Sequence, residues 1–385
     1  MKQVSNRCKR DDTMFTLVLD MNNIMKISTV NHDMNNDGAE YGMIVTALRI
    51  IGDVLRKKDF NYCVACYDGI GSGVLRWKLY KDYKANRGKR YERHDPDNTE
   101  YEKGMYASEL LMLEKARLKK IGSGDYEESE DEKFERQKYV IQNILEELCV
   151  RQYEFENVEG DDIVAYYVKN KKDNEKVVIV SSDKDLTQLI SDSVIIYNPR
   201  MKDFITKDNS VSKIGITHEN VVLEKMLCGD ASDNIKGVRG IGEQTLIKLF
   251  PSIKSEKTDL NAILARSREL LDERTANKKK PLKTLENILN GVTDGCQGDK
   301  LYEINKRIID LSEPLLTEDA MKELDEVLYA PIDTSDRDFK NIYNIIRENK
   351  IEHLYDEEKF GNLFSPYSRI VAMEKKRFKE FKENG

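Results

Sequence analysis

The sequence contains no apolar run that approaches the roughly 20 residues needed to span a bilayer as a helix. Residues 1–13 are polar and lack the apolar core of a signal peptide. These absences argue against a membrane-spanning or exported protein and predict a cytoplasmic one. Hydrophobic residues still make up 39% of the 385-residue chain, which is enough for one large domain or two smaller ones.

Cysteine and histidine are both scarce. The 6 cysteines are scattered, which favours free thiols over a disulfide framework. Cys63 and Cys66 form a lone CxxC in a strand-like run, where residues three apart face opposite sides, so we do not expect a zinc or redox site there. None of the 4 histidines neighbours the acidic residues described below, which argues against zinc at those positions too.

The chain also lacks the net positive charge that is typical of nucleic-acid-binding proteins, because its net charge is −7. This average hides a strong segregation of charge. Local basic patches set the affinity for phosphates, so nucleic acid is not excluded as a partner. Residues 75–93 carry only Asp82 and Glu92 against the basic residues Arg76, Lys78, Lys81, Lys84, Arg87, Lys89, Arg90 and Arg93.

Short apolar runs alternate with helical patterns along much of the chain. Such alternation predicts an α/β fold with a mainly parallel central sheet flanked by helices. Residues 74–134 are highly charged without a strand signal, and we interpret them as a protruding, partly helical, mobile element. The region after Asp230 is predicted to be helical. The predicted strands are residues 15–20, 60–67, 151–155, 176–181 and 193–197, and the predicted helices are residues 40–58, residues 135–148, and segments after Asp161 and after Lys184.

Acidic residues close several of these strands and open the helices that follow. Asp20 and Asp68, for example, end the first two predicted strands. The carboxyl ends of parallel strands meet at one edge of a sheet, where ligands usually bind, so we expect the acids to converge. The full set is Asp20, Asp68, Glu159, Asp161, Asp162, Asp183, Asp185, Asp230 and Asp233.

So many carboxylates in one place repel each other unless cations neutralise them. Carboxylate oxygens suit Mg²⁺ or Mn²⁺, and two such ions about 4 Å apart can activate water and stabilise the leaving oxygen in phosphodiester hydrolysis. Any one of the acids, taken alone, could be a helix cap or a surface charge; Asp161 and Asp183 could cap the helices that follow them. The number of acids at successive strand ends favours a metal cluster.

Lys84 and Arg87 would share one face of a helix and could hold a scissile phosphate or stabilise its developing charge. Taken alone, however, their segment is better explained as a solvated basic face.

Residues 237–242 (GVRGIG) lie between two helical stretches. Glycines let the backbone approach a phosphate closely, and the helix that begins near Glu243 adds its positive end. Such a hairpin grips a duplex backbone without reading sequence. An ordinary helix–turn–helix connection is the alternative, but the regular glycine spacing favours phosphate binding by Gly237, Val238, Arg239, Gly240, Ile241 and Gly242.

Together these motifs resemble the 5′ nuclease family, which includes bacteriophage 5′–3′ exonucleases, phage-type RNase H, the nuclease domain of bacterial DNA polymerase I and flap endonucleases. Residues 227–249 (LCGDASDNIKGVRGIGEQTLIKL) look like the family's GDxxDNIxGVxGIG block. VEGDDI at 158–163, SSDKDL at 181–186, YDG at 67–69 and YKDYKANR at 80–87 are similarly close. The resemblance covers more than half of the chain.

The resemblance implies a PIN-like nuclease fold with a helical arch and two Mg²⁺ or Mn²⁺ ions. It implies that Asp20, Asp68, Glu159, Asp161 and Asp162 hold the first ion, directly or through water, and that Asp183, Asp185, Asp230 and Asp233 hold the second, with Asp161 near both. Asp161, Lys84 and Arg87 are the expected catalytic residues.

The resemblance also implies how DNA is held. Lys84 and Arg87 would lie at the base of the arch, Arg76 would contact DNA, and Tyr83 would stack on a base. The glycine hairpin would bind the downstream duplex, with a K⁺ ion on its carbonyls. Beyond the matched motifs, in an apparent insertion after the hairpin, Lys278, Lys279 and Lys280 are expected to add a phosphate contact.

We therefore expect a nuclease domain at residues 1–215, with the arch at 74–134. A helical duplex-binding region would follow at 216–385, with a helix–hairpin–helix-like motif at 237–242 and an insertion at about 252–298.

The expected activity is that of a structure-selective 5′→3′ exonuclease and flap endonuclease in DNA replication or repair. Its substrates would be branched or 5′-ended DNA and RNA–DNA hybrids. Two alternatives stay open: a non-catalytic branched-DNA binder of the same fold, and a metal-dependent RNase or phosphatase. A monomer is expected, with a single-strand-binding protein or another replisome component as partner and no membrane. If the chain is phage-encoded, its location is the cytoplasm of the bacterial host.

Overall fold

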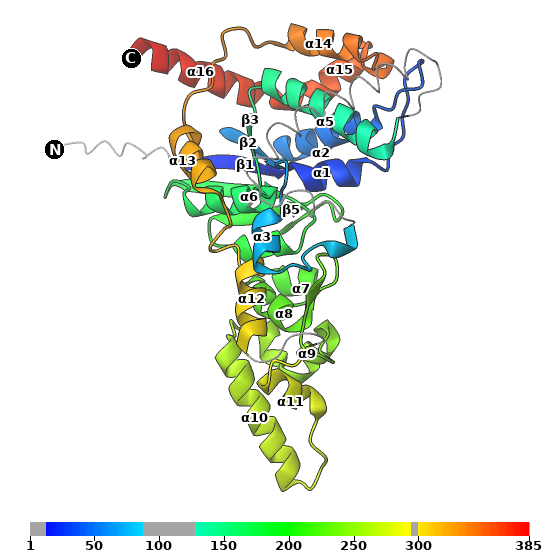
Figure 1. Cartoon of the computed structure of the whole chain (residues 1–385). Coiled ribbons are helices and arrows are strands. Elements are labelled where there is room, and N and C mark those ends of the chain that lie inside the picture. The colour runs from blue at the N-terminus through cyan, green and yellow to red at the C-terminus, as the bar shows by residue number, and fades with distance from the viewer. Residues whose placement is uncertain (1–12, 88–127, 294–298, 385) are drawn as a thin grey trace, which may run out of the picture.

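A six-stranded sheet lies at the centre of the upper half of the molecule (Figure 1). The computed structural model describes residues 13–87, 128–293 and 299–384. The strand order is β3-β2-β1-β4-β5-β6, with parallel pairing throughout except for the antiparallel pair β5–β6. The strands are β1 (Met14–Asp20), β2 (Tyr62–Asp68), β3 (Arg151–Phe155), β4 (Glu175–Val180), β5 (Val194–Asn198) and β6 (Asp203–Ile205). The predicted mainly parallel sheet is confirmed.

Helices cover both faces of this sheet. Alternate residues of a strand point to opposite faces: Leu17 and Cys63 enter one buried cluster, whereas Val18 and Cys66 enter the other. The two cysteines of the CxxC thus face opposite sides, as predicted. The first face carries α1 (Met21–Ser28), α2 (Gly42–Leu55), α5 (Glu130–Glu147), α14 (Phe339–Glu348), α15 (Glu357–Phe364) and α16 (Ser368–Asn384), and the second carries α6 (Gly160–Lys169) and α13 (Glu318–Val327).

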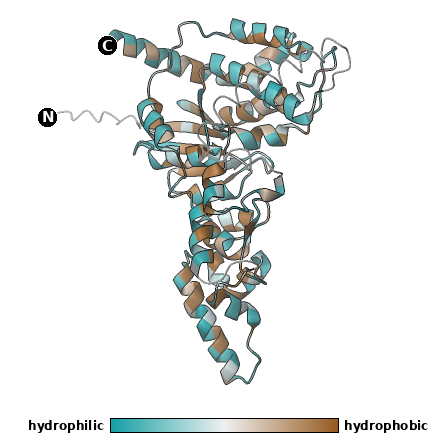
Figure 2. Ribbon diagram, viewed as in Figure 1, coloured by the Kyte–Doolittle hydropathy of each residue, from teal (hydrophilic) through white to brown (hydrophobic). Residues whose placement is uncertain are grey.

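A narrower helical region continues below the sheet in Figure 1. It has its own apolar cluster, which includes Leu246, Ile263 and Ile288. Figure 2 shows the loop between α10 and α11 as hydrophilic, at the far end of this region. The elements are α7 (Ser210–Ile214), α8 (Val221–Cys228), the short hairpin β7 (Gly229–Asp230) and β8 (Ile235–Lys236), α9 (Glu243–Leu249), α10 (Leu260–Ala276), α11 (Lys283–Leu289) and α12 (Asp299–Ile309).

Several local expectations need correction. Helix α1 begins directly after β1 and was not predicted, and the segment after Lys184 is a 3₁₀ helix (Asp185–Leu189) instead of an α-helix. Strand β6 was missed because it has only 3 residues. Most of the expected arch lies in residues 88–127, outside the described residues; its described flanks are α3 (Val74–Leu79), the 3₁₀ turn Ala85–Arg87 and the start of α5.

The C-terminal helices α14–α16 pack onto the sheet and not onto the helical region around the hairpin. Ile342, Ile346 and Tyr367 belong to the same buried cluster as Leu17, and the Tyr367 hydroxyl donates a 2.7 Å hydrogen bond to the Leu48 carbonyl of α2. The division at residues 215 and 216 stays a prediction, but this packing places residues 339–371 with the α/β part of the chain.

We predict that Ile346→Ala destabilises the whole α/β core, because Ile346 is fully buried within the shared cluster. The expected loss is about 2–5 kcal/mol in the free energy of unfolding, measured by urea denaturation. Met201→Ala is the control, since Met201 is 49% exposed; it should change stability by less than about 0.5 kcal/mol. A local unfolding step of α14–α16, with the sheet unaffected, would contradict this packing.

Candidate active site

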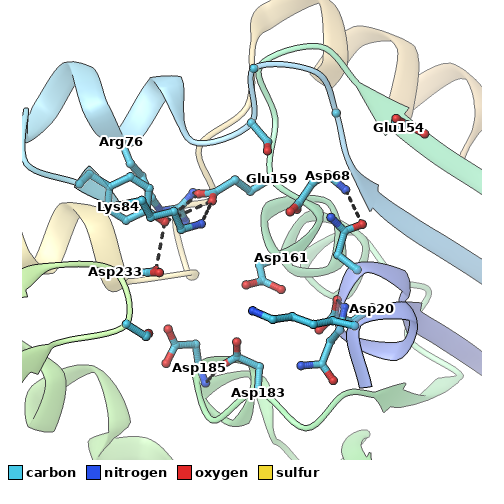
Figure 3. Close-up of a pocket in the computed structure, with 18 of the residues that line it drawn as sticks. Asp20, Asp68, Arg76, Lys84, Glu154, Glu159, Asp161, Asp183, Asp185 and Asp233 are labelled. Atoms are coloured by element: carbon cyan, nitrogen blue, oxygen red, sulfur yellow. Dashed lines mark hydrogen bonds and ion pairs between the residues drawn. The ribbon is translucent and has the colours of Figure 1, made fainter. Parts of the chain in front are cut away.

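Eight of the nine predicted acids line one hollow at the carboxyl edge of the sheet. The hollow has a volume of about 1340 Å³. Figure 3 shows Asp20, Asp161 and Asp183 pointing into a common space from three different elements. The eight acids are Asp20, Asp68, Glu159, Asp161, Asp183, Asp185, Asp230 and Asp233.

Two asparagines at the start of α1 join the strand ends that carry these acids. Asn22 Oδ1 accepts a hydrogen bond from the Asp68 backbone N–H (3.2 Å). Asn23 Oδ1 accepts one from the Ser182 backbone N–H (2.9 Å), and the Ser181 hydroxyl donates one to Asp20 (2.6 Å). The ends of β1, β2 and β4 are therefore held together by polar side chains. The sequence signal was present, since the two asparagines lie two and three residues after the acid that ends β1.

The acids in the middle of the hollow are crowded with negative charge. Burial raises the pKa of Asp20 to about 7, and the carboxylates of Asp183 and Asp68 add to this rise. Burial likewise raises the pKa of Asp161 well above its usual range, helped by Asp20 and Asp183. Neither Asp20 nor Asp161 has an ion-pair partner among the described residues. A proton or an added cation must therefore offset their charge.

The donor set fits a hard divalent cation, because all eight groups are carboxylates and no histidine lines the hollow. Within the described ranges, however, no three Asp, Glu, His or Cys side chains already stand around one point as a finished metal site. The acids line one hollow, but their side chains are spaced too widely to coordinate a single ion together.

Protein cations neutralise the acids at one side of the hollow. Glu159 forms ion pairs with Lys84 and, at 2.5 Å, with Arg76. Burial alone would raise the pKa of Glu159, but Lys84 and Arg76 outweigh it and lower the pKa to about 2. On the opposite side, Lys225 pairs with Asp185 and, at 2.6 Å, with Asp230.

Asp162 and Arg76 do not have their predicted roles. Asp162 is fully buried and does not line the hollow. Its carboxylate accepts a 3.0 Å hydrogen bond from Arg76 and a 2.8 Å hydrogen bond from the Leu315 backbone N–H. Arg76 also donates to the Ile308 carbonyl (2.9 Å). A guanidinium held by two buried carboxylates and a carbonyl is an internal ion pair, so the expectations of a metal ligand and a DNA contact are corrected.

Tyr83 is only 2% exposed, which contradicts base stacking by its ring. Its hydroxyl donates to Glu159 (3.1 Å) and lies 3.2 Å from Asp233. Lys84 has a left-handed backbone (φ 52°) before the 3₁₀ turn Ala85–Arg87, so it does not share a helical face with Arg87. The Arg87 side chain lies outside the described residues.

Sequence reasoning missed several other side chains that line the hollow. Lys26 on α1 is an exposed cation with no ion pair among the described residues. Ile70, in the turn after Asp68, and Tyr139, on α5, are exposed apolar groups. No local motif marks these residues, because they reach the hollow only through the packing of α1, α5 and the β2 turn.

The glycine hairpin at residues 237–242 joins β8 to α9 and is rigidly held. A side chain at Gly237 would meet the Cys228 backbone at 2.1 Å, and Gly240 has φ +84°. The side chains of Val238 and Ile241 are buried, so only their main chain can reach a ligand. The Arg239 N–H donates to the Val292 carbonyl (2.8 Å), which fixes the hairpin against the segment after α11.

The lysines Lys278, Lys279 and Lys280 lie far from the acids, in the loop between α10 and α11 (Figure 1). All three are exposed. Arg274 donates a 2.9 Å hydrogen bond to the Lys280 carbonyl, which braces the loop on α10.

The fold and the hollow define a class of α/β proteins. In this class, a mainly parallel sheet gathers carboxylates at its carboxyl edge and is extended by a helical region with a glycine hairpin. The family model of the "5′-3′ exonuclease, N-terminal resolvase-like domain" matches residues 17–225, more than half of the chain. The chain belongs to this family, and the resemblance inferred from the motifs is confirmed.

Relatives in other organisms show the same similarity. The chain is 28% identical over 204 residues to a 5′-3′ exonuclease of Aquifex aeolicus, covering 53% of this chain and 56% of that protein. It is 38% identical over 128 residues to DNA polymerase I of Bacillus subtilis, covering 32% of this chain but 14% of that protein. The chain thus spans only part of the length of these relatives.

Among solved structures, the T5 5′-exonuclease with bound divalent metal ions is similar, with a TM-score of 0.53. The superposition has 18% sequence identity and covers 87% of this chain and 99% of that one. This similarity confirms the fold. In the described part of the chain, no helix combines the length and the apolar character that crossing a membrane requires.

If Arg76 is an internal ion-pair partner, Arg76→Ala should destabilise the protein in the absence of DNA. It would leave the buried carboxylate of Asp162 without its cation and Glu159 with Lys84 alone, which costs about 3–5 kcal/mol. Thermal and urea unfolding measure this loss. Lys78→Ala removes the same charge from an exposed position of the same helix and is the control. Equal stability of the two variants, with weaker DNA binding by Arg76→Ala, would restore the DNA-contact role.

Proposed function

We propose that the protein is a structure-selective 5′→3′ exonuclease and flap endonuclease. It would hydrolyse phosphodiester bonds in DNA, and in RNA primers of RNA–DNA hybrids, during replication or repair. The observation that carries this proposal is the hollow that gathers eight of the nine predicted acids, in a chain of the 5′-3′ exonuclease family. A cytoplasmic location, a monomeric state and a replisome partner belong to the same proposal.

Two Mg²⁺ or Mn²⁺ ions are the proposed cofactors. Asp20, Asp68, Glu159 and Asp161 would hold one ion, and Asp183, Asp185, Asp230 and Asp233 the other. When bound, the two ions supply an activated water and stabilise the leaving oxygen. The raised pKa of Asp20 and Asp161 supports this assignment, because added positive charge would offset both the burial and the neighbouring carboxylates that raise it.

The protein's own cations would then orient the phosphate. Lys84 lies at the side of the hollow in an ion pair with Glu159. From this position the Lys84 ammonium would donate to a phosphate oxygen of a strand bound in the hollow. Lys26 and Arg87 are proposed as further phosphate contacts. Tyr83 would keep Glu159 and Asp233 in position through its hydroxyl.

We predict that Asp161→Asn lowers the rate of cleavage by orders of magnitude while DNA binding is retained. The neutral amide keeps the shape of the side chain but removes a charge that would hold the ions. The assay is cleavage of a labelled 5′-flap DNA with Mg²⁺ or Mn²⁺, and chelation should abolish it. Asp319→Asn, at an exposed position of α13, is the control.

Full activity of Asp161→Asn would refute the metal role. Binding of flap DNA by the native protein without any products would favour a non-catalytic DNA binder. Turnover of a small phosphate ester, with none of flap DNA, would favour a phosphatase, and cleavage confined to RNA would favour an RNase.

Binding of the downstream duplex is proposed for the helical region. The Gly240 N–H and the exposed Arg239 side chain would contact phosphates, with a K⁺ ion on the hairpin carbonyls, and Lys278, Lys279 and Lys280 would contact others. The hairpin and the lysine loop belong to one packed unit, because Asn287 of α11 donates a 2.9 Å hydrogen bond to the Arg239 carbonyl. Contacts to the backbone position a duplex without reading its sequence.

The triple variant Lys278→Ala, Lys279→Ala, Lys280→Ala should lower the dependence of duplex affinity on salt. Each lost phosphate contact reduces the slope of log K against log[salt] by about 0.9, so the expected change is about 3. Binding is measured by fluorescence anisotropy at several salt concentrations without divalent metal. The control removes the same charge from α16, through Lys375→Ala, Lys376→Ala and Lys379→Ala. Equal slopes for the two variants would exclude the loop as a contact.

A further inference from the structure

Helix α5 forms a wall of the hollow to which the proposed metal chemistry gives no role. One face of α5, with Phe134, Lys138 and Tyr139, lines the hollow. The opposite face of α5, with Ile141 and Ile144, is buried in the core. The helix thus presents side chains to the hollow from a fixed position.

Two apolar side chains of the hollow are exposed. Tyr139 is 65% exposed and Ile70 is 49% exposed. The other aromatic residues of the lining differ from Tyr139: Tyr83 is buried, and Phe134 packs against the core. Among the residues the structure describes, Tyr139 is therefore the aromatic ring in the hollow that offers an open face.

Tyr139 stands on a braced part of α5. Its neighbour Lys138 pairs with Glu154 of β3 at 2.8 Å, and Gln142, on the next turn, donates a 2.8 Å hydrogen bond to the same carboxylate. The Gln142 carbonyl in turn accepts a 2.9 Å hydrogen bond from Gln152. These contacts tie the helix to the sheet on both sides of Tyr139, so little backbone order would be lost when a ligand binds there.

Ile70 is held in a similar way. Its carbonyl accepts a 2.7 Å hydrogen bond from Asn157, and the N–H of Gly69 donates a 3.0 Å hydrogen bond to the Val158 carbonyl. A side chain at Gly69 would meet the Phe155 carbonyl at 1.7 Å, so the turn is packed directly on the β3 end. The exposed isoleucine projects from a rigid turn beside Asp68.

The chemistry of this wall favours a base over a phosphate. Asp131 and Glu135 also line it and repel a phosphodiester backbone, whereas an uncharged aromatic ring stacks on a nucleobase of any type. Bases within a duplex are covered by their neighbours, so only an unpaired base offers its face. The volume of 1340 Å³ exceeds the roughly 300–1,000 Å³ of small-molecule pockets, which leaves room for a strand segment.

We propose that Tyr139 stacks on an unpaired base of the 5′ strand bound in the hollow, with Ile70 as a second apolar contact to the same strand. This inference rests on the proposed function, because it assumes that a nucleic-acid strand enters the hollow. It places the strand with its bases toward α5 and its phosphates toward the carboxylate side.

The test uses flap DNA that carries one 2-aminopurine at successive unpaired positions of the 5′ strand, bound without divalent metal. Stacking quenches the fluorescence of this base analogue. The native protein should quench it most strongly at one position, Tyr139→Phe should keep that quenching, and Tyr139→Ala should abolish it. Tyr139→Ala should also weaken binding about 5- to 150-fold. Phe381→Ala, which removes a 56% exposed ring from α16, is the matched control and should behave like the native protein.

An abasic site at the quenched position gives a second readout that needs no variant of the protein. The native protein should lose affinity for that substrate, and Tyr139→Ala should show no further loss. Native quenching and native affinity in Tyr139→Ala, or an additional loss with the abasic substrate, would overturn the stacking role. Failure of the proposed function is distinguishable, because it appears as intact binding and quenching with no cleavage after Mg²⁺ or Mn²⁺ is added.

Discussion

The main constraint on the structure is the repulsion among carboxylates that the parallel sheet brings to one edge. β1, β2 and β4 end side by side, and each places acids at or just after its last residue. Their negative charges cannot all be solvated in a buried hollow, so the fold must offset them. It does so unevenly. Arg76 and Lys84 neutralise Glu159, and Lys225 pairs with Asp185 and Asp230. Asp20 and Asp161 have no ion-pair partner among the described residues, and burial raises their pKa values as it does that of Asp185. The acids at two sides of the hollow are therefore paired with protein cations. The acids at its centre are not, and they need added positive charge.

The paired side also explains why some basic residues are unsuited to binding DNA. Arg76 belongs to a charged stretch of sequence, yet its guanidinium is buried between α3, α6 and the end of α12. Burying a charge is tolerated only when it is paired and hydrogen-bonded, and Arg76 meets both conditions. The same contacts remove Asp162 from the hollow. A charge in a basic run is thus available to a phosphate only if no buried carboxylate has taken it first.

Much of the α/β part could be predicted from the sequence, because apolar runs that end in acids are strong local signals for buried parallel strands. The predicted strand at residues 151–155 coincides with β3, and the acids meet as expected. The errors concern contacts between residues far apart in the chain. The Arg76–Asp162 pair joins α3 to α6, and Tyr83, after α3, is buried against Ile235 of β8 and Ile308 of α12. No spacing rule encodes such packing. Helix α1 was missed because its short pattern follows a strand without a break, and its asparagines act through backbone groups of β2 and β4.

Helix α12 connects the glycine hairpin to the hollow through buried hydrogen bonds. The buried Asn305 donates hydrogen bonds to the carbonyls of Met226 (3.0 Å) and Lys236 (2.8 Å), next to the glycine hairpin. About one turn further along the same helix, the Ile308 carbonyl accepts from Arg76, which also binds Glu159 at the hollow. One helix therefore sets the spacing between the hairpin and the carboxylates through buried polar contacts, which are costly to break. A duplex held by its backbone at the hairpin would present its end at a fixed distance from the hollow. Selection of the cleavage position would then follow from the geometry of α12, without any contact to the base sequence.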